Sequence, residues 1–297
     1  MNFINRLLSI LVLLFFFVGC PNRTDSKFSI RSEKQNPWTH LNVNNQRFFQ
    51  FAIVGDRSGG LRPGVFRKAA SQLNSIHPDF VMSIGDLIDS RDLKHQSVPF
   101  DETKVRQRWD EFNSIVESLK MPFFYVSGNN DIRNTQMEQI WREQFGRTYY
   151  SFVYDRVLFI VLNSDDPPGG RNGRLSDTQM KCLEQTLIQN KHVRWTFIFI
   201  HRPIWRYEGH QDWHRIQELL GDRQRTVFSG HHHRYSKSVI NGHAHYMLAT
   251  TGGSSDLSGI EQGKFDHILW VTMTDSVPEI ANLLLDGILV DEPAEMQ

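Results

Sequence analysis

The segment Phe48–Gly59, which reads FFQFAIVGDRSG, decides the fold. Gln50 is the one polar residue in Phe48–Val54, so we predict a β-strand there that is buried on both faces. The glycine that follows this strand lets the backbone turn tightly. Asp56 then stands at the strand exit, where its carboxylate is a candidate ligand for a metal ion.

The same arrangement occurs four more times along the chain. A short run rich in Asp, Asn or His follows each of four apolar segments, Phe80–Ile84, Phe123–Val126, Trp195–Ile200 and Thr226–Ser229; the runs are Gly85–Asp89, Gly128–Asp131, His201–Pro203 and Gly230–His233. Ligands collect at the carboxyl ends of strands in open α/β sheets. Carboxylate, amide and imidazole groups at five strand exits therefore predict a metal site with oxygen and nitrogen ligands. Two adjacent divalent ions are a common means of hydrolysing phosphate esters.

The rest of the pattern predicts alternating helices and strands. Apolar residues at helical spacing indicate helices over residues 64–76, 101–119, 136–145, 176–189 and 210–220. Strands are predicted over 149–154 and 157–162, which form a hairpin, and over 246–250, 267–273 and 280–285. A βαβα opening followed by strand-rich sequence indicates an α/β domain in which a mixed sheet joins a second sheet.

The composition fits a globular domain. Of the 297 residues, 39% are hydrophobic and 12% are aromatic, which is enough for a sizeable core. Basic and acidic residues are balanced, 33 against 33, and no basic run occurs. We therefore expect no nucleic-acid-binding patch. The composition indicates no particular oligomeric state.

The N-terminal residues predict export. Arg6 precedes the apolar run Leu7–Val18, which is too short to span a bilayer but suits the core of a signal peptide. The residues up to Cys20 resemble the lipobox of bacterial lipoproteins, although Phe17 departs from its usual aliphatic residue. Ordinary secretion with an incidental Cys is the alternative. We expect a signal peptide over 1–19, a flexible tether over 20–46 lipid-anchored to the bacterial cell envelope through Cys20, a domain over 47–289 and a tail over 290–297.

The five motifs, in this order, resemble those of the calcineurin-like metallophosphoesterases. That family has D-x-H, G-D-x-x-D, G-N-H-D/E, a later His and G-H-x-H, and the resemblance extends from Phe48 to Leu289. It implies a four-layer α-β-β-α sandwich with two mixed β-sheets. It also implies two divalent metal ions (Mn, Fe or Zn) and hydrolysis of a phosphomonoester or phosphodiester by a metal-bridging hydroxide.

The resemblance further implies which residues would bind the ions. Asp86 would bridge both ions, and Asp89 would orient a catalytic His, as the family's residue at that place does. The six ligands would be Asp56, Asp86 and His233 for the first ion, with Asn129, His201 and His231 beside Asp86 for the second.

Two departures from the family motifs bear on catalysis. Ser58 replaces the His of D-x-H, so we expect weaker binding of the first ion. Asn130 replaces the His of G-N-H-D, and an amide contacts phosphate but gives up no proton. Arg57 is a candidate phosphate clamp, with a surface Arg as the alternative. The candidates for a replacement acid are His95, His210 and His232, although solvated loop histidines are the simpler interpretation.

These departures leave three hypotheses open. The preferred one is an exported, metal-dependent phosphoesterase whose turnover is slow without a general acid, which typically contributes about 10²–10⁴-fold. The second is a catalytically impaired lipoprotein of the same fold that binds metal or phosphate. The third is a surface interaction protein that uses the fold only as a scaffold.

Overall fold

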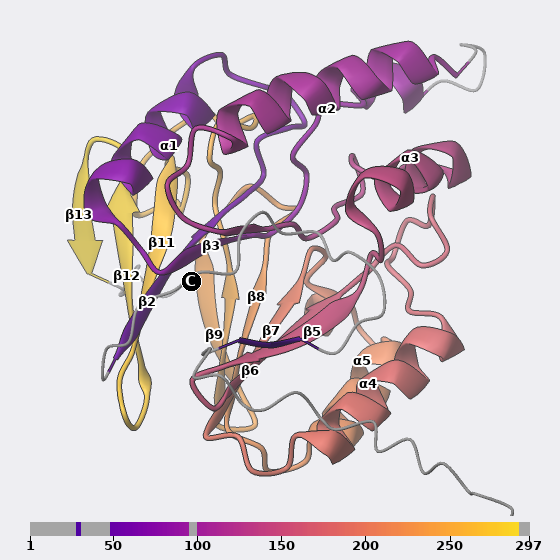
Figure 1. Cartoon of the computed structure of the whole chain (residues 1–297), viewed down its shortest axis with the longest axis vertical. Helices are drawn as coiled ribbons and strands as arrows, with labels where there is room; N and C mark the ends of the chain where they lie inside the picture. The colour runs from indigo at the N-terminus through magenta and orange to yellow at the C-terminus, as the bar shows by residue number, and fades with distance from the viewer. Residues whose placement is uncertain (1–27, 31–47, 95–99, 291–297) are drawn as a thin grey trace, which may run out of the picture.

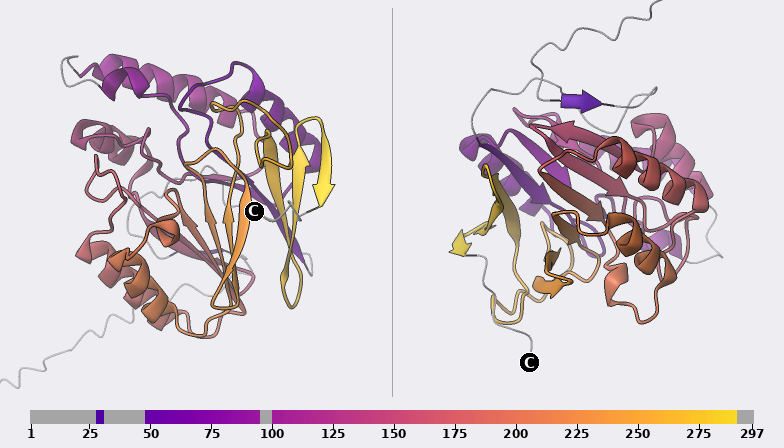
Figure 2. Two further views of the ribbon diagram at one scale, coloured as in Figure 1. Left: turned by 180° about the vertical axis from the view of Figure 1, so that it is seen from behind. Right: turned by 90° about the horizontal axis from the view of Figure 1, so that it is seen from below.

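The computed structural model describes residues 28–30, 48–94 and 100–290. Two β-sheets pack face to face and helices cover the outer face of each (Figure 1). Figure 2 shows the same layers from behind and from below. Both sheets contain parallel and antiparallel neighbours. The four-layer α-β-β-α sandwich with two mixed sheets is therefore confirmed.

The first sheet carries the segment that opens the domain. Its strand order is β13-β12-β11-β2-β3-β4. The strands are β2 (Phe49–Val54), β3 (Phe80–Ser83), β4 (Phe123–Phe124), β11 (His267–Met273), β12 (Pro278–Leu284) and β13 (Gly287–Val290). Because β2, β3 and β4 are parallel neighbours, the segments that follow them leave the sheet at the same edge.

In the second sheet, the histidine motifs also lie at the carboxyl ends of parallel strands. Its order is β1-β5-β6-β7-β8-β10-β9. The strands are β1 (Phe28–Ile30), β5 (Tyr150–Tyr154), β6 (Val157–Leu162), β7 (Trp195–Ile200), β8 (Arg225–Ser229), β9 (Ser236–Ile240) and β10 (His243–Met247). β7 and β8 are parallel neighbours, so the segments beginning at His201 and Gly230 leave together.

The helices separate into two outer layers. Those over the first sheet are α1 (Val65–Ile76), α2 (Glu102–Val116) and α3 (Thr135–Phe145); those over the second are α4 (Asp177–Gln189) and α5 (Gln211–Leu220). Short 3₁₀ turns, η1 (Arg91–Lys94) and η2 (Ile204–Arg206), lie in the connections. Ser176 caps α4 by accepting a hydrogen bond from the backbone N–H of Gln179. No helix in these described ranges is long and apolar enough to cross a bilayer.

Aromatic rings fill the space between the sheets. Phe80 stacks on Phe51 at a centroid distance of 5.3 Å and meets Phe159 edge-on at 5.4 Å. All three rings are fully buried. Their packing explains why β2 and β3 are apolar on both faces, since one face meets the facing sheet and the other meets helices.

The main differences from the predicted elements lie near the chain ends. β10 ends at Met247, whereas the sequence predicted a strand over 246–250. β9 and β13 were not predicted, because each is short and lies at a sheet edge with little periodicity. Within the predicted tether, β1 pairs antiparallel with β5. The predicted signal peptide, Cys20 and His95 lie outside the described residues.

Candidate metal centre

Five loops supply the candidate ligands, and both sheets contribute. Asp56 and Asp86 follow β2 and β3, and Asn129 lies in the loop after β4. His201 follows β7, and the Gly230–His233 segment follows β8. Residues that are far apart in sequence thus meet where the carboxyl ends of the two sheets come together.

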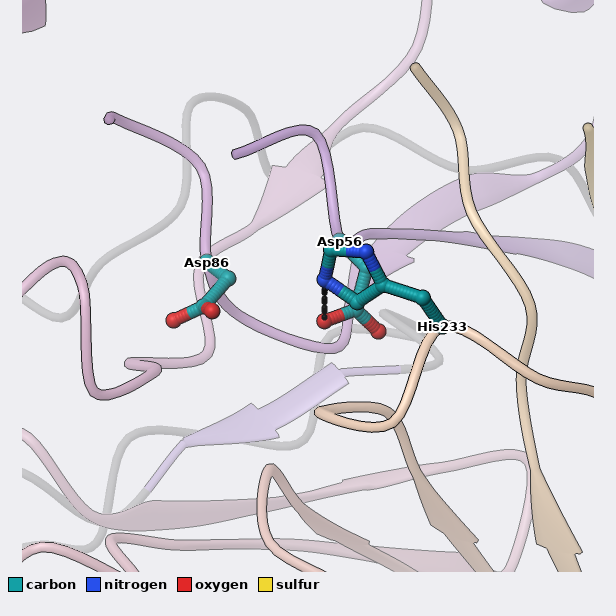
Figure 3. Close-up of side chains that lie close together, drawn as sticks. All are labelled: Asp56, Asp86 and His233. Atoms are coloured by element: carbon teal, nitrogen blue, oxygen red, sulfur yellow. Dashed lines mark ion pairs between the residues drawn. The ribbon is translucent and has the colours of Figure 1, made fainter. Parts of the chain in front are cut away.

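The tightest cluster joins Asp56, Asp86 and His233. Each offers one ligand atom, and these atoms all lie within 4.8 Å of one another. Figure 3 shows the two carboxylates side by side on neighbouring loops, with the imidazole over Asp56. His233 Nε2 is 3.5 Å from Asp56 Oδ1. Two carboxylates and an imidazole are a donor set that suits Mn, Fe or Zn.

Two histidines are oriented in the way that metal ligands require. His201 Nδ1 donates to the backbone carbonyl of Ile84 at 2.8 Å, and His233 Nδ1 donates to that of Ser254 at 2.7 Å. Nε2 of each ring then faces a carboxylate. In particular, His201 Nε2 lies 3.3 Å from Asp86 Oδ1, and this buried atom has no hydrogen-bond partner among the residues described. Fixing one ring nitrogen on a carbonyl and presenting the other is typical of metal-binding histidines.

His231 is oriented differently. Its Nε2 lies 3.0 Å from Nη1 of Arg202, whose Nε donates to Asp165 Oδ1 at 3.0 Å. Because a guanidinium only donates, Nε2 must accept, and the ring proton is then on Nδ1. Ligation of a metal ion by His231 therefore requires release of the Arg202 contact.

Two more buried oxygen atoms are candidate metal ligands. Asn129 Oδ1 and Ser58 Oγ are buried and accept or donate no hydrogen bond within the described ranges. Asn129 lines a cavity of about 450 Å³ together with Asp86, His231 and His233. Buried polar atoms are normally satisfied. Unsatisfied oxygen and nitrogen atoms around two carboxylates fit a site built for cations.

The left-handed backbone at the ligand positions is a further sign of a functional site. The φ angles are 47° at Asp56, 55° at Asp86, 76° at His231 and 53° at His233. Residues with side chains rarely adopt positive φ, and structures that hold them there commonly do so at active sites.

The two carboxylates differ in proton affinity. Burial raises the pKa of Asp56 to about 6, although the nearby His233 and His201 oppose the shift. Burial also acts on Asp86, but His201 and the backbone N–H of Asn130 outweigh it and hold the pKa of Asp86 well below its usual range. For His201, burial lowers the pKa, yet the Asp86 carboxylate prevails and raises it to about 10.

Asn130 donates two hydrogen bonds to the Asp86 carboxylate. Its backbone N–H donates to Asp86 Oδ1 at 2.7 Å and its side-chain Nδ2 donates to Asp86 Oδ2. Its Oδ1 accepts from Nη2 of Arg133 and from Ser90 Oγ, the latter at 3.3 Å. The amide orientation is fixed, because the carboxylate only accepts and the guanidinium only donates.

Two of the predicted catalytic residues form ion pairs. Arg57 is buried, donates to the carbonyl of Leu87 at 2.9 Å, and pairs with Glu111 of α2 at 2.6 Å, so its guanidinium is committed to structure and not to phosphate. Asp89 accepts from the backbone N–H of Arg91 at 3.0 Å and pairs with that side chain at 3.1 Å. Asn130 is held by Ser90 and Arg133, and the orienting role expected for Asp89 stays a prediction.

The candidate replacement acids differ in their surroundings. His210 caps α5 and its Nε2 lies 3.0 Å from the carbonyl oxygen of Gly173, so its ring is engaged in structure. His232 is exposed and lines the cavity. His95 lies outside the described residues.

Asp131 is a residue that the sequence interpretation missed. It is fully buried and accepts from three backbone N–H groups, those of Leu87 at 2.7 Å, Ile88 at 3.0 Å and Gly128 at 2.8 Å. Burial and the Asp86 charge raise its pKa to about 7. Asp131 therefore fixes the loops after β3 and β4 relative to each other. Its position at the end of the Gly128–Asp131 motif was the sequence feature that could have identified it.

Comparison with known proteins now identifies the family. The sequence profile of the calcineurin-like phosphoesterases matches residues 49–235, which is more than half of the chain. The chain belongs to this family. The human protein named serine/threonine-protein phosphatase CPPED1 is 25% identical over 221 residues, covering 69% of this chain and 68% of the relative. The Danio rerio protein of that name is 28% identical over 201 residues, covering 59% and 61%.

Solved structures agree on the fold of this family member. GAP50, described as the anchor in the inner membrane complex of Plasmodium, has a TM-score of 0.60 at 14% identity, covering 85% of this chain and 92% of that one. The purple acid phosphatase PPD1 from yellow lupin also has a TM-score of 0.60, at 16% identity, covering 83% and 53%. At these identities the likeness shows the fold alone.

We predict that Gly128→Ala disturbs the metal centre. A Cβ at Gly128 would overlap the backbone N and Oδ1 of Asp86, so the Asp86 loop must move. Overpacking of this kind costs about 1–3 kcal/mol, and we expect both a lower melting temperature and reduced metal content by elemental analysis. Gly287→Ala is the matched control, because a Cβ there meets no atom within 4 Å. Full metal content in Gly128→Ala would contradict the placement of Asp86 at the centre.

We also predict that metal binding releases more protons as the pH falls. With a pKa of about 10, His201 is protonated at pH 8 in the metal-free chain and must lose that proton to bind an ion. Asp56, with a pKa of about 6, adds a second proton as the pH drops from 8 to 5. Calorimetry of Mn²⁺ binding in buffers of different ionisation enthalpy measures this release. Asp56→Asn should remove the increase, and a release that stays constant from pH 8 to 5 would refute the assignment.

Proposed function

We propose that this protein is a hydrolase of phosphate esters that depends on two divalent metal ions. The observation that carries the proposal is the convergence of Asp56, Asp86 and His233, from loops of both sheets, within 4.8 Å. Family membership supports hydrolysis of a phosphomonoester or a phosphodiester, and the phosphatase names of the relatives support a phosphomonoester. Ions bound there would activate water and neutralise charge on the phosphate.

The residues around the centre indicate which groups would bind each of the two ions. Asp86 offers one oxygen toward His201 and shares the cluster with Asp56 and His233, and these contacts support the proposal that it would be a ligand shared by two ions. For the second ion, His201 Nε2 and Asn129 Oδ1 would be ligand atoms. His231 would join them once its contact with Arg202 is broken. The site of the first ion has Ser58 in place of a His, which makes it the weaker of the two.

Asn130 determines which leaving groups would react fastest. An amide transfers no proton to a departing alkoxide, so good leaving groups should react fastest. The same residue favours a second candidate function, a catalytically impaired protein that binds metal and phosphate. Its amide is tied to Asp86 and Arg133, as expected of a group that stabilises the centre.

Assays with activated esters test the proposal. We expect hydrolysis of 4-nitrophenyl phosphate or its bis ester with added Mn²⁺ or Zn²⁺, and loss on chelation. Asp86→Asn should lower turnover by about 10²-fold or more, because a bridging ligand contributes several kcal/mol of charge stabilisation. Asp177→Asn, an exposed carboxylate paired with Arg215, is the control. Metal binding without hydrolysis in the wild type would favour the second candidate.

We also propose export and lipid anchoring through Cys20. The support is the sequence of residues 1–20 alone, which precedes the described domain. A Cys20→Ser variant should leave the membrane fraction and lose incorporated radiolabelled palmitate. Membrane association and labelling that are the same as in the wild type would refute the anchor.

A further inference from the structure

The cavity over the candidate metal centre has an unusual wall. Its volume is about 450 Å³, and every described residue that lines it is glycine or carries a polar or charged side chain. Part of the lining comes from the ligand motifs. Another part comes from Ser254, Ser255, Asp256 and Lys264, which no motif includes.

The Ser254–Asp256 segment is held at a fixed distance from the metal centre. The Ser254 carbonyl accepts the Nδ1 hydrogen of His233 at 2.7 Å. The preceding residue, Gly253, leaves no room for a side chain, since a Cβ would overlap the carbonyl oxygen of Asp56 and lie 2.6 Å from that of Ser58. The segment therefore packs directly against the loop that carries Asp56.

A partly buried ion pair anchors the same segment. Arg62 binds both carboxylate oxygens of Asp266, at 2.6 and 2.5 Å, and donates from Nε to the Gly253 carbonyl at 2.8 Å. Asp266 also accepts from the backbone N–H of Gly252 at 3.1 Å. Bidentate pairing fixes orientation as well as distance, so the wall is preorganised.

The exposed groups of this wall are hydrogen-bonding groups. Lys264 Nζ lies 2.7 Å from Asp256 Oδ2, and their side chains are 37% and 57% exposed. Ser255 Oγ accepts from the backbone N–H of Leu257 at 3.1 Å and keeps its own hydroxyl hydrogen. An apolar group here would strip water from these atoms without replacing its hydrogen bonds, which is costly. Hydroxyl groups could replace those waters.

We propose that Ser254, Ser255, Asp256 and Lys264 form a leaving-group subsite that selects phosphate esters of hydroxylated alcohols, such as polyols or sugars. This inference rests on the proposed phosphoesterase function. None of these four side chains offers an aromatic face on which a nucleobase or phenyl ring could stack, and the rings among the described lining residues are the imidazoles of His231, His232 and His233. The subsite holds donors and acceptors at a fixed place beside His233, in the cavity that Asp86, Asn129 and His233 also line.

Binding of two non-hydrolysable phosphonates to the full chain with Mn²⁺ tests the subsite. 3,4-Dihydroxybutylphosphonate and 4-phenylbutylphosphonate share the phosphonate and the four-carbon chain, and differ in the terminal group. We expect calorimetry to show about tenfold or greater preference for the dihydroxy compound, the size of one or two hydrogen bonds to charged groups. Lys264→Met should remove most of that preference. Lys68→Met, an exposed lysine paired with Asp286 outside the cavity, should retain it.

The outcomes separate the subsite from the proposed function. Equal binding, preference for the phenyl compound, binding of neither phosphonate, or preference unchanged in Lys264→Met would overturn the subsite. Hydrolysis of glycerol 1-phosphate and 3-phenylpropyl phosphate, both esters of primary alcohols, is measured in parallel. If neither of these esters nor 4-nitrophenyl phosphate is hydrolysed while the binding preference persists, the hydrolase proposal fails and the four residues stand only as a binding subsite for hydroxylated phosphates.

Discussion

The burial of two carboxylates, those of Asp56 and Asp86, is the constraint on which the rest of this structure depends. Both side chains are at most 2% exposed. Buried charges are costly unless they are paired and hydrogen-bonded. The compensating groups come from other loops, namely the backbone N–H groups of His231 and Asn130 and the ring of His201. The two sheets are thus tied together at their carboxyl ends by the need to satisfy these acids.

The backbone at the centre reflects the same constraint. Four of the six candidate ligand positions take left-handed φ values, and glycines stand where another chain segment comes too close for a side chain. A Cβ at Gly230, for example, would overlap the Asp56 carboxylate. Such local strain persists only where surrounding contacts fix it. Here the aromatic layer between the sheets and the Asp131 hydrogen bonds supply that fixation.

The centre is asymmetric in a way that the family motifs do not imply. His201 and His233 each rest on a backbone carbonyl, whereas His231 meets a guanidinium. Asn130 joins Arg133 to Asp86 through a single amide. Asn130 therefore stabilises the Asp86 carboxylate.

The sequence by itself determined the layers of the fold and the residues that gather at its strand ends. Strands such as Trp195–Ile200 were predictable because a continuous apolar run is strong local information, and Asp56, Asp86 and His233 were predictable from motif order. Only the tertiary structure decided what those neighbours contact: Arg57 pairs with Glu111, and Arg202 lies beside His231. The reason is physical. Burial and periodicity are properties of consecutive residues, whereas the partner of a charged side chain is set by which loop lies a few ångströms away after folding.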